Sequence, residues 1–344
     1  MTRRDDNLMQ DFRVGVMAAA AMAIIMFAAV GGVVGLIWMN LPDQQTTQFL
    51  GVPDDHREVA EAAYAAYPEP FAVEGSDPAN YAKNVRMWEV PGVRERLNPG
   101  PQQTGDCPAW SLHTPLMVRQ CISVAQGKRG EITVPFPPSL YATGRVRNGR
   151  SDPPCGRAGG YPSRMIEGAK ADGWLTSDEF GQPYSGALAD RVGCRGLTPA
   201  QLTISRKRAG LSAYPVRSVD EWAEASVNGF PTTVAFYFSR NCRIEQRDGR
   251  SVVKLRTGTK LGNHAVCCIG YDGSSGRRYW YLFNSHGANW PEGAERNGGE
   301  PPGCCAIDED DARWIVQTGQ VWAISDVPGF EVDELDLSIF DKLN

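Results

Sequence analysis

Two short apolar runs in the second half of the chain, each adjoining a polar residue, constrain the fold most strongly. His264 directly precedes the run Ala265–Tyr271, and Asn284 directly follows the run Tyr279–Phe283. Both lie far downstream of a Gly-x-Cys that ends at Cys107. A thiol attacks a carbonyl well only as thiolate, so it needs an imidazole to take its proton and a third group to orient that imidazole. The pattern predicts a cysteine–histidine–asparagine site and hence a thiol hydrolase.

Helical signals come first along the chain and strand signals follow. A buried helix bent at Pro115 is expected after Cys107, and helices over Ser163–Asp172 and Val219–Val227 end close to glycines. Residues 126–162 are rich in Gly and Pro and are predicted to be a loop. The predicted strands are Pro231–Phe238, Ser251–Leu255, Ala265–Tyr271, Tyr279–Phe283 and Gln320–Ser325. This order predicts an α+β fold with a helical lobe facing a β lobe.

The N-terminal part contains an uncharged apolar stretch, Val14–Met39. It exceeds the roughly 20 residues that cross a bilayer, and no small-residue cleavage site follows it, so an uncleaved transmembrane anchor is favoured over a cleaved signal peptide. Three arginines precede the stretch and the next basic residue is Arg57, which places the N-terminus inside and the rest outside the cytoplasm. The Gly31-xxx-Gly35 spacing allows two such helices to self-associate.

These features divide the chain into five expected segments. They are a cytoplasmic-side tail (1–13), the membrane anchor (14–39), a stalk or short pro-like segment (40–100), the catalytic domain (101–325) and an acidic C-terminal tail (326–344). The formal net charge of −5 gives no electrostatic reason to expect a nucleic acid partner.

Nine cysteines are expected in an oxidising compartment, which predicts disulfides plus one free thiol, with Cys107 as the free one. A zinc site built from Cys267, Cys268, Cys304 and Cys305 is the alternative, but no Cys-x-x-Cys spacing supports it. We therefore predict no metal and no cofactor. Pro108 favours a helix that begins next to Cys107, and a helix N-terminus lowers a thiol pKa. Gln102 or Gln103 is placed to donate an N–H to an oxyanion.

Four motifs in the expected order carry a family resemblance. They are Gly105-Asp106-Cys107-Pro108-Ala109-Trp110-Ser111, Gly159-Gly160 after Cys155, His264-Ala265-Val266 with Gly270-Tyr271, and Asn284-Ser285-His286-Gly287. Over about residues 100–325 the chain resembles the papain-like (C1-type) cysteine peptidases.

The resemblance implies a two-lobed fold, a helical lobe plus a β-barrel-like lobe, with peptide or protein substrates hydrolysed through an acyl-enzyme in the cleft between them. Cys107 would be the nucleophile, His264 the general base and then acid, and Asn284 the orienting residue. Gln102 or Gln103 would supply the oxyanion donor, and His286 would shield the Asn–His bond from water. The substrate-binding residues would be Gly159, Gly160, Asn263 and Trp290.

Two departures from the family pattern keep other functions open. Pro108 replaces the aromatic residue that follows the nucleophile, and His286 replaces the shielding tryptophan. They favour a catalytically inactive papain-like binding or structural module. A cell-wall-directed thiol hydrolase is the third hypothesis, against which the Asn-Ser-x-Gly block argues. Residues 40–100 are short for the inhibitory propeptide of the family.

Overall fold

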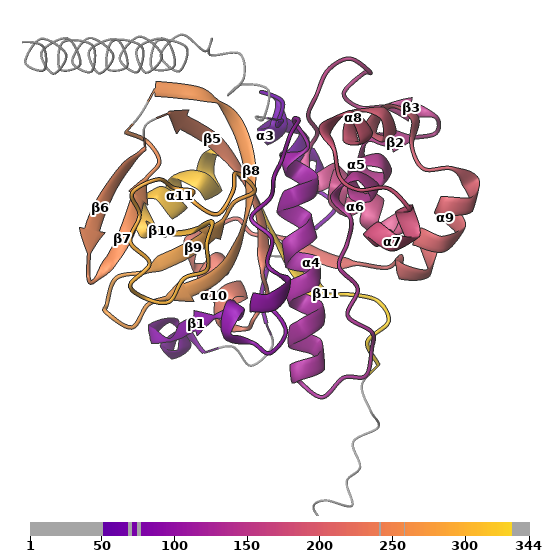
Figure 1. Cartoon of the computed structure of the whole chain (residues 1–344). Coiled ribbons are helices and arrows are strands. Elements are labelled where there is room, and N and C mark those ends of the chain that lie inside the picture. Colours follow the sequence, from indigo (N-terminus) through magenta and orange to yellow (C-terminus); the bar gives the residue numbers. More distant parts are fainter. Residues whose placement is uncertain (1–50, 68–70, 74–76, 241, 258, 332–344) are drawn as a thin grey trace, which may run out of the picture. The chain divides into compact units, whose positions relative to one another are not determined.

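The computed structural model describes residues 51–331 except 68–70, 74–76, 241 and 258, and all of them lie in one compact unit. The strands of the large sheet gather on one side of the long helix α4 (Cys107–Ala125), as Figure 1 shows. The helices α5–α9 and the short hairpin of β2 (Val146–Arg147) and β3 (Arg150–Ser151) lie on the other. The predicted tail 1–13 and membrane span 14–39 lie outside the described residues, as do residues 332–344. Within the described part, no helix is both long and apolar enough to cross a membrane.

The β side is one nine-stranded sheet in the order β4-β11-β5-β8-β9-β10-β7-β6, with β1 added beside β8. Its pairs are antiparallel except for β7 and β10, which run parallel. The strands are β1 (Asn84–Arg86), β4 (Ser212–Pro215), β5 (Thr232–Arg240), β6 (Arg243–Arg247), β7 (Arg250–Lys254), β8 (Thr259–Asp272), β9 (Tyr279–Phe283), β10 (Cys304–Asp308) and β11 (Gln320–Asp326). Each of the five predicted strands is confirmed within a few residues.

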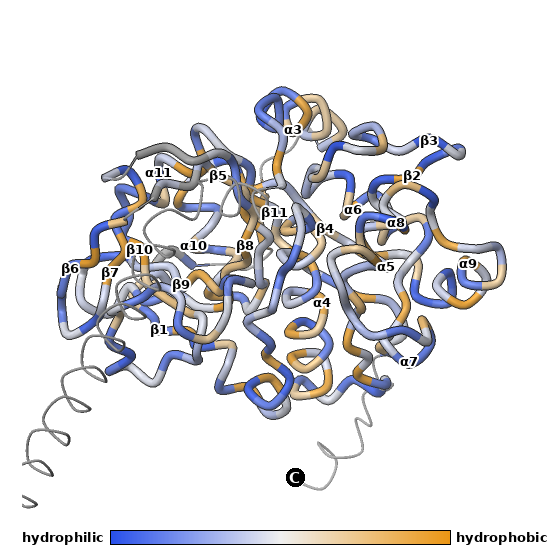
Figure 2. Tube along the Cα trace, turned by 45° about the horizontal axis from the view of Figure 1, so that its top comes forward, coloured by the Kyte–Doolittle hydropathy of each residue, from blue (hydrophilic) through white to orange (hydrophobic). Residues whose placement is uncertain are grey.

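Apolar cores cover both faces of the sheet. Helices α10 (Val219–Val227) and α11 (Glu309–Thr318) pack on one face through Trp222 and Ile315. On the other face Tyr281 and Phe283 pack with Met117 of α4. A strand buried on both faces is apolar throughout, as β9 is, and this explains why the run Tyr279–Phe283 shows no alternation. The tube in Figure 2 is coloured mainly hydrophobic along parts of these inner elements and hydrophilic along many of the outer loops.

Helix α4 is the central element of the fold. Every residue from Cys107 to Ser123 is buried, since the helix is covered by β8 on one side and by α5 and α6 on the other. A helix that is buried all round needs no polar stripe, which explains its mixed apolar spacing. Pro108 lies in its first turn, as predicted, and Pro115 lies inside it. The helix therefore fixes Cys107 at the boundary between the two sides.

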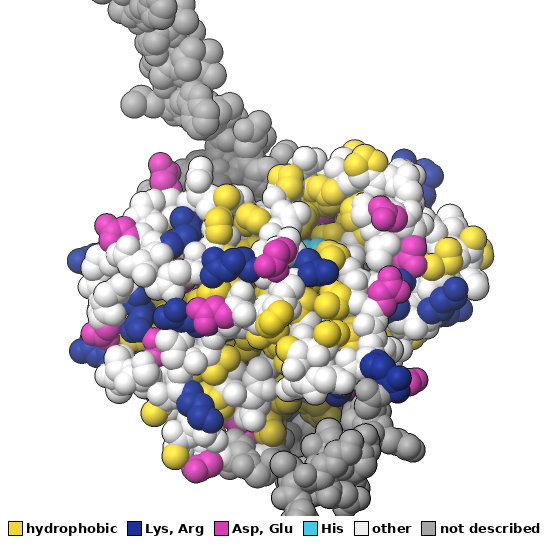
Figure 3. Space-filling view, turned by 60° about the horizontal axis from the view of Figure 1, so that its bottom comes forward, with side chains coloured by type: hydrophobic (Ala, Val, Ile, Leu, Met, Phe, Trp, Pro, Cys, Tyr) yellow, Lys and Arg dark blue, Asp and Glu magenta, His cyan; other side chains and the backbone are white. Residues whose placement is uncertain are grey.

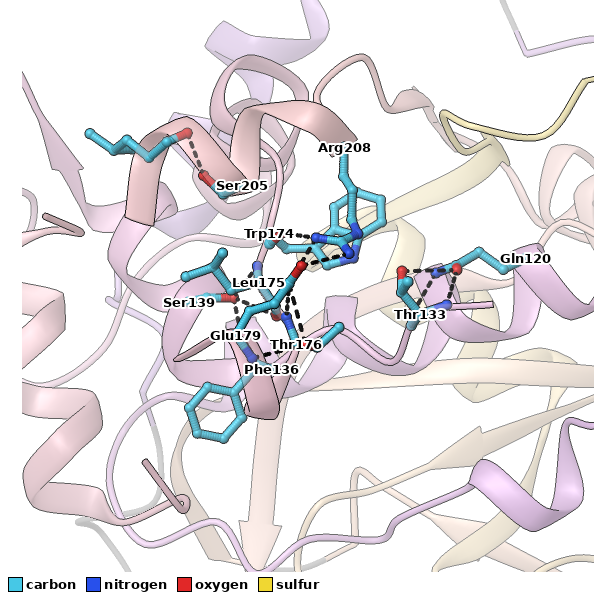
Figure 4. A network of polar contacts seen from close by, with 11 residues as sticks. Gln120, Thr133, Phe136, Ser139, Trp174, Leu175, Thr176, Glu179, Ser205 and Arg208 are labelled. Atoms are coloured by element: carbon cyan, nitrogen blue, oxygen red, sulfur yellow. Dashed lines mark hydrogen bonds and ion pairs between the residues drawn. The ribbon is translucent and has the colours of Figure 1, made fainter. Parts of the chain in front are cut away.

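The helical side contains α5 (Pro137–Arg145), α6 (Pro162–Asp172), α7 (Ser177–Phe180), α8 (Gly186–Arg195) and α9 (Pro199–Ser205). The prediction that residues 126–162 form a loop is wrong over α5, because Pro137 and Pro138 occupy the first helical turn, where no backbone N–H is needed. Figure 4 shows the polar contacts that tie this side together. Glu179 accepts from both Arg208 guanidinium nitrogens at 2.9 and 3.0 Å, and Thr133 is held by Gln120 of α4.

Residues 51–100 contribute to the same cores as the rest of the chain. Ala60 and Tyr64 of α3 (His56–Tyr64) belong to the core of the helical side, Phe71 to one face of the sheet and Trp88 to the other. Arg57 donates to the carbonyl oxygens of Val316 and Gly319 at 3.0 and 2.9 Å. The part of the predicted stalk that the structure describes is therefore packed into the domain.

All nine cysteines have free thiols, so the prediction of disulfides is wrong for this structure. Strand β9 separates β8 from β10, with Phe283 opposite both Cys267 and Cys304. Two strand spacings, about 9.5 Å, exceed the reach of a disulfide. Cys267 and Cys304 face one core whereas Cys268 and Cys305 face the other, so the four thiols cannot converge on one zinc ion. Within the described residues no other group of His, Cys, Asp or Glu is arranged to hold a metal.

Candidate active site

Strands β8 and β9 bring His264 and Asn284 together. His264 Nε2 lies 2.8 Å from Asn284 Oδ1, and the backbone N–H of Ser285 donates to the same oxygen at 2.7 Å. An amide oxygen only accepts, so His264 carries its proton on Nε2 and can accept a second proton at Nδ1. The sequence prediction of an imidazole oriented by a carboxamide matches this geometry.

His286 stacks on His264, with ring centroids 4.4 Å apart and planes 30° apart. Asn284 is 1% exposed, so the bond between Asn284 and His264 is shielded from solvent. Burial lowers the pKa of His264 well below 6.5, and the nearby His286 lowers it further, whereas the Asn284 bond raises it. Burial also lowers the pKa of His286 to about 4. Both rings are therefore neutral at pH 7.

Cys107, the first residue of α4, packs against Ala265, the neighbour of His264 on β8. Its side chain is fully buried. Burial raises the pKa of the Cys107 thiol to about 12, while backbone N–H groups of Ala265 and Gly51 lower it. The prediction that the helix N-terminus lowers this pKa is not met in the described state, because removal of water outweighs the helix dipole.

Residues 51–54 lie across the predicted substrate-binding residues. Gly160 donates its N–H to the carbonyl oxygen of Gly51 at 2.6 Å, and Val52 donates to the carbonyl oxygen of Asn263 at 3.4 Å. The Asn263 amide also donates to the carbonyl oxygen of Pro53 at 3.1 Å and to Asp54 at 3.0 Å. Val52 shares a buried cluster with Cys107, and the backbone of Gly51 is hydrogen-bonded to the Cys107 thiol. The chain's own segment therefore covers the thiol, and an incoming ligand reaches Cys107 only after this segment moves.

Of the remaining predicted site residues, Gln102 is joined to the Asn284 block, whereas Gln103 and Trp290 have other contacts. Gln102 is buried; it accepts from Ser285 Oγ at 2.7 Å and donates to the carbonyl oxygen of Thr104 at 2.7 Å, which joins it to the Asn284 block. Gln103 is exposed and accepts from the backbone N–H of Gly186, so of the two predicted oxyanion donors Gln102 is the one joined to the Asn284 block. Trp290 packs against the core of the β side, and none of its described contacts is with the predicted catalytic residues.

Tyr141 and Arg145 hold the backbone of residues 153–159, and neither residue was predicted from the sequence. The Tyr141 hydroxyl donates to the carbonyl oxygen of Gly159 at 2.9 Å and accepts from its N–H at 2.8 Å. Arg145 is buried and donates to Tyr141, to the carbonyl oxygens of Pro153 and Arg157, and more weakly to that of Pro154. Both residues lie on α5, four residues apart. A helix prediction there would have placed them on one face, next to the Gly159-Gly160 motif.

Asp106, next to the candidate nucleophile, is fully buried and accepts from the Tyr184 hydroxyl at 3.1 and 3.2 Å. Burial raises the pKa of Asp106 from 3.8 to about 8, against the opposing effect of the Tyr184 bond. Between these two pKa values the carboxyl group keeps its proton in the folded chain but loses it in the unfolded chain. Its contribution to the free energy of unfolding therefore declines as pH rises from about 4 to about 8, by up to about 1.4 kcal/mol per pH unit.

We expect Asp106→Asn, which cannot ionise, to remove this decline. The variant should gain much more stability over the parent at pH 8 than at pH 5. Urea unfolding at both pH values, followed by circular dichroism, measures the difference. Equal gains at the two pH values would contradict a raised pKa of Asp106.

Comparison with known proteins agrees with this fold. Residues 147–298, which include His264 and Asn284 but not Cys107, match the model of the papain family cysteine proteases. The chain is 29% identical over 157 residues to the gut-specific cysteine proteinase of Caenorhabditis elegans, covering 40% of this chain and 46% of that protein. It is 28% identical over 141 residues to the oryzain gamma chain of Oryza sativa subsp. japonica, covering 39% and 35%. The alignments therefore span less than half of these relatives.

Solved structures share the fold at low identity. Xylellain, a cysteine protease from Xylella fastidiosa, superposes with a TM-score of 0.56 at 15% identity, over 82% of this chain and 97% of that one. The procathepsin B S9 of Trypanosoma congolense gives 0.54 at 14% identity, over 85% and 90%. Residues 147–298 therefore resemble the papain family of cysteine proteases, and the chain shares its fold with solved cysteine proteases.

Proposed function

We propose that the chain is a membrane-anchored cysteine peptidase that hydrolyses peptide bonds through Cys107, His264 and Asn284. The observation that carries the proposal is the 2.8 Å bond from His264 Nε2 to Asn284 Oδ1, on the strand that packs against the N-terminus of α4. The bond leaves Nδ1 of His264 as the proton acceptor. Ala265, the next residue on β8, shares a buried cluster with Cys107. A thiol, a base and an orienting group are the parts that acyl transfer requires.

In the proposed reaction the Cys107 sulfur attacks the substrate carbonyl carbon while its proton passes to His264 Nδ1. The carbonyl oxygen takes up negative charge, which an N–H of Gln102 stabilises. The imidazolium then gives its proton to the leaving amine as the C–N bond breaks. Water, deprotonated by the same imidazole, hydrolyses the thioester and restores the thiol. Asn284 keeps the ring in one tautomer throughout.

The location of the domain is part of the proposal. The uncharged span 14–39 and the arginines before it place the catalytic domain outside the cytoplasm. Figure 3 shows one face of the molecule, on which basic and acidic side chains alternate around apolar ones.

Labelling with an epoxide inhibitor selective for papain-like thiolates tests the proposal. The full chain in detergent micelles, treated at pH 5 to 7, is expected to gain one adduct, which peptide mapping places on Cys107. Cys107→Ala should lose the adduct and the ability to cleave casein.

An inactive binding module is the second candidate, because Cys107 is fully buried and burial raises its pKa. Gly51→Ala, which displaces the covering segment, separates the two. A folded Gly51→Ala chain that still forms no adduct would exclude the peptidase and favour the module.

A further inference from the structure

The segment over Cys107 fits the cleft through a glycine. Gly51 packs closely against two other glycines, Gly105, two residues before Cys107, and Gly159. A Cβ atom on Gly51 would lie 1.7 Å from the carbonyl oxygen of Gly105 and 2.3 Å from its carbon, both backbone atoms that cannot turn away. A Cβ atom on Gly159 would lie 2.4 Å from the carbonyl oxygen of Gly51. The space at Gly51 therefore admits a bare backbone but no side chain.

Backbone hydrogen bonds hold the segment at this narrow position. The carbonyl oxygen of Gly51 accepts from Gly160, and the next residue, Val52, donates to the carbonyl oxygen of Asn263. One bond goes to the helical side and the other to strand β8. Because both hydrogen bonds use backbone atoms, any peptide that follows the path of residues 51–52 can make them. Only the side chains at the positions of Gly51 and Val52 can then discriminate among peptides.

The position of Val52 is a small apolar site. Val52 is 7% exposed and belongs to one buried cluster with Ala235, Ala265 and Cys107. The alanines leave room for a short aliphatic side chain, and burial of a charged one here would be costly because this cluster provides no partner for it. The two positions together favour a glycine followed by a small aliphatic residue.

The covering segment remains attached to the folded domain. Asp54 is bound by Asn263, Asp55 accepts from the Tyr161 hydroxyl at 3.0 Å, and α3 begins at His56 with Ala60 in the core. The segment therefore acts at a high effective concentration, and a free peptide must compete with it.

We propose that the cleft selects peptides with glycine at the position of Gly51 and a small aliphatic residue at the position of Val52, and that Gly51-Val52 is their tethered competitor. The inference rests on the proposed function only in taking the cleft as a peptide site. It names the substrate class of that site as glycine-containing peptides, because a larger residue meets the backbone of Gly105.

The rate at which iodoacetamide alkylates Cys107 tests the inference without requiring turnover. Peptide mapping follows Cys107 in the full chain, with the exposed Cys155 as internal reference. Gly51→Ala is expected to speed alkylation of Cys107 at least tenfold and to leave Cys155 unchanged. Val52→Asp should act in the same direction, and a thermal melt identifies any variant that does not fold. Unchanged alkylation of Cys107 in the folded variants would overturn the inference.

The second arm uses Gly51→Ala as the open form. The capped peptide Gly-Val-Pro-Asp-Asp, which has the sequence of residues 51–55, is expected to slow alkylation of Cys107, whereas Ala-Val-Pro-Asp-Asp should protect at least tenfold less well. Equal protection by both peptides would overturn the glycine selectivity even if the chain cleaves casein. Selective protection without any cleavage would support the selectivity and count against the proposed peptidase activity.

Discussion

His264→Ala is expected to lower the rate of epoxide adduct formation on Cys107 at pH 6 by about 10³-fold or more. Burial raises the pKa of the Cys107 thiol, and His264, the proposed base, precedes Ala265 on the strand that packs against Cys107. Without the imidazole, thiolate forms only as the pH approaches the pKa of the thiol. The second-order rate of inactivation, measured from pH 5 to 9, should then rise steadily with pH instead of reaching a plateau.

Two neighbouring residues provide matched controls for His264. Asn284→Ala leaves the base in place but removes the acceptor 2.8 Å from Nε2, so we expect a smaller loss, about 10- to 100-fold. His286→Ala removes a stacked ring that takes no part in proton transfer, and about a tenfold loss or less is expected. If His264→Ala reacts within tenfold of the parent, another group activates Cys107 and the proposed mechanism is wrong.

The β side could be predicted from the sequence because its signals are local. Buried strands such as Tyr279–Phe283 are continuous apolar runs. Two polar residues next to such runs, His264 within β8 and Asn284 directly after β9, indicated where the candidate site lies. Gly159, Gly160 and Asn263 were predicted to bind substrate, and all three contact the same segment of the chain, residues 51–54.

What the sequence did not reveal depends on contacts between distant residues. The binding of Gly51 to Gly160 joins positions more than a hundred residues apart, and no local pattern distinguishes a segment that fills a cleft from a solvated stalk. The expected low pKa of Cys107 failed for the same reason, because helix position is visible in the sequence whereas burial by Val52 is not. The disulfide prediction relied on compartment and count, which carry no information about strand order.

Arg145→Met is expected to lower the free energy of unfolding by about 3 kcal/mol and to loosen the wall that carries Gly159 and Gly160. Arg145 is 2% exposed, and no carboxylate pairs with it among the described residues. Its guanidinium satisfies the carbonyl oxygens of Pro153 and Arg157 and the Tyr141 hydroxyl. Methionine fills a similar volume but donates nothing, so these buried acceptors lose their donors.

Arg147→Met is the matched control, since Arg147 is exposed two residues later and pairs with Glu167 at the surface. Exposed ion pairs contribute about 1 kcal/mol at most, so this variant should unfold near the parent. Urea denaturation gives both free energies, and limited proteolysis reports opening of residues 152–160. Because Tyr141 fixes both backbone groups of Gly159 and is itself held by Arg145, we expect faster cleavage there in Arg145→Met alone. Equal stabilities for the two variants would show that the buried guanidinium does not hold the cleft wall.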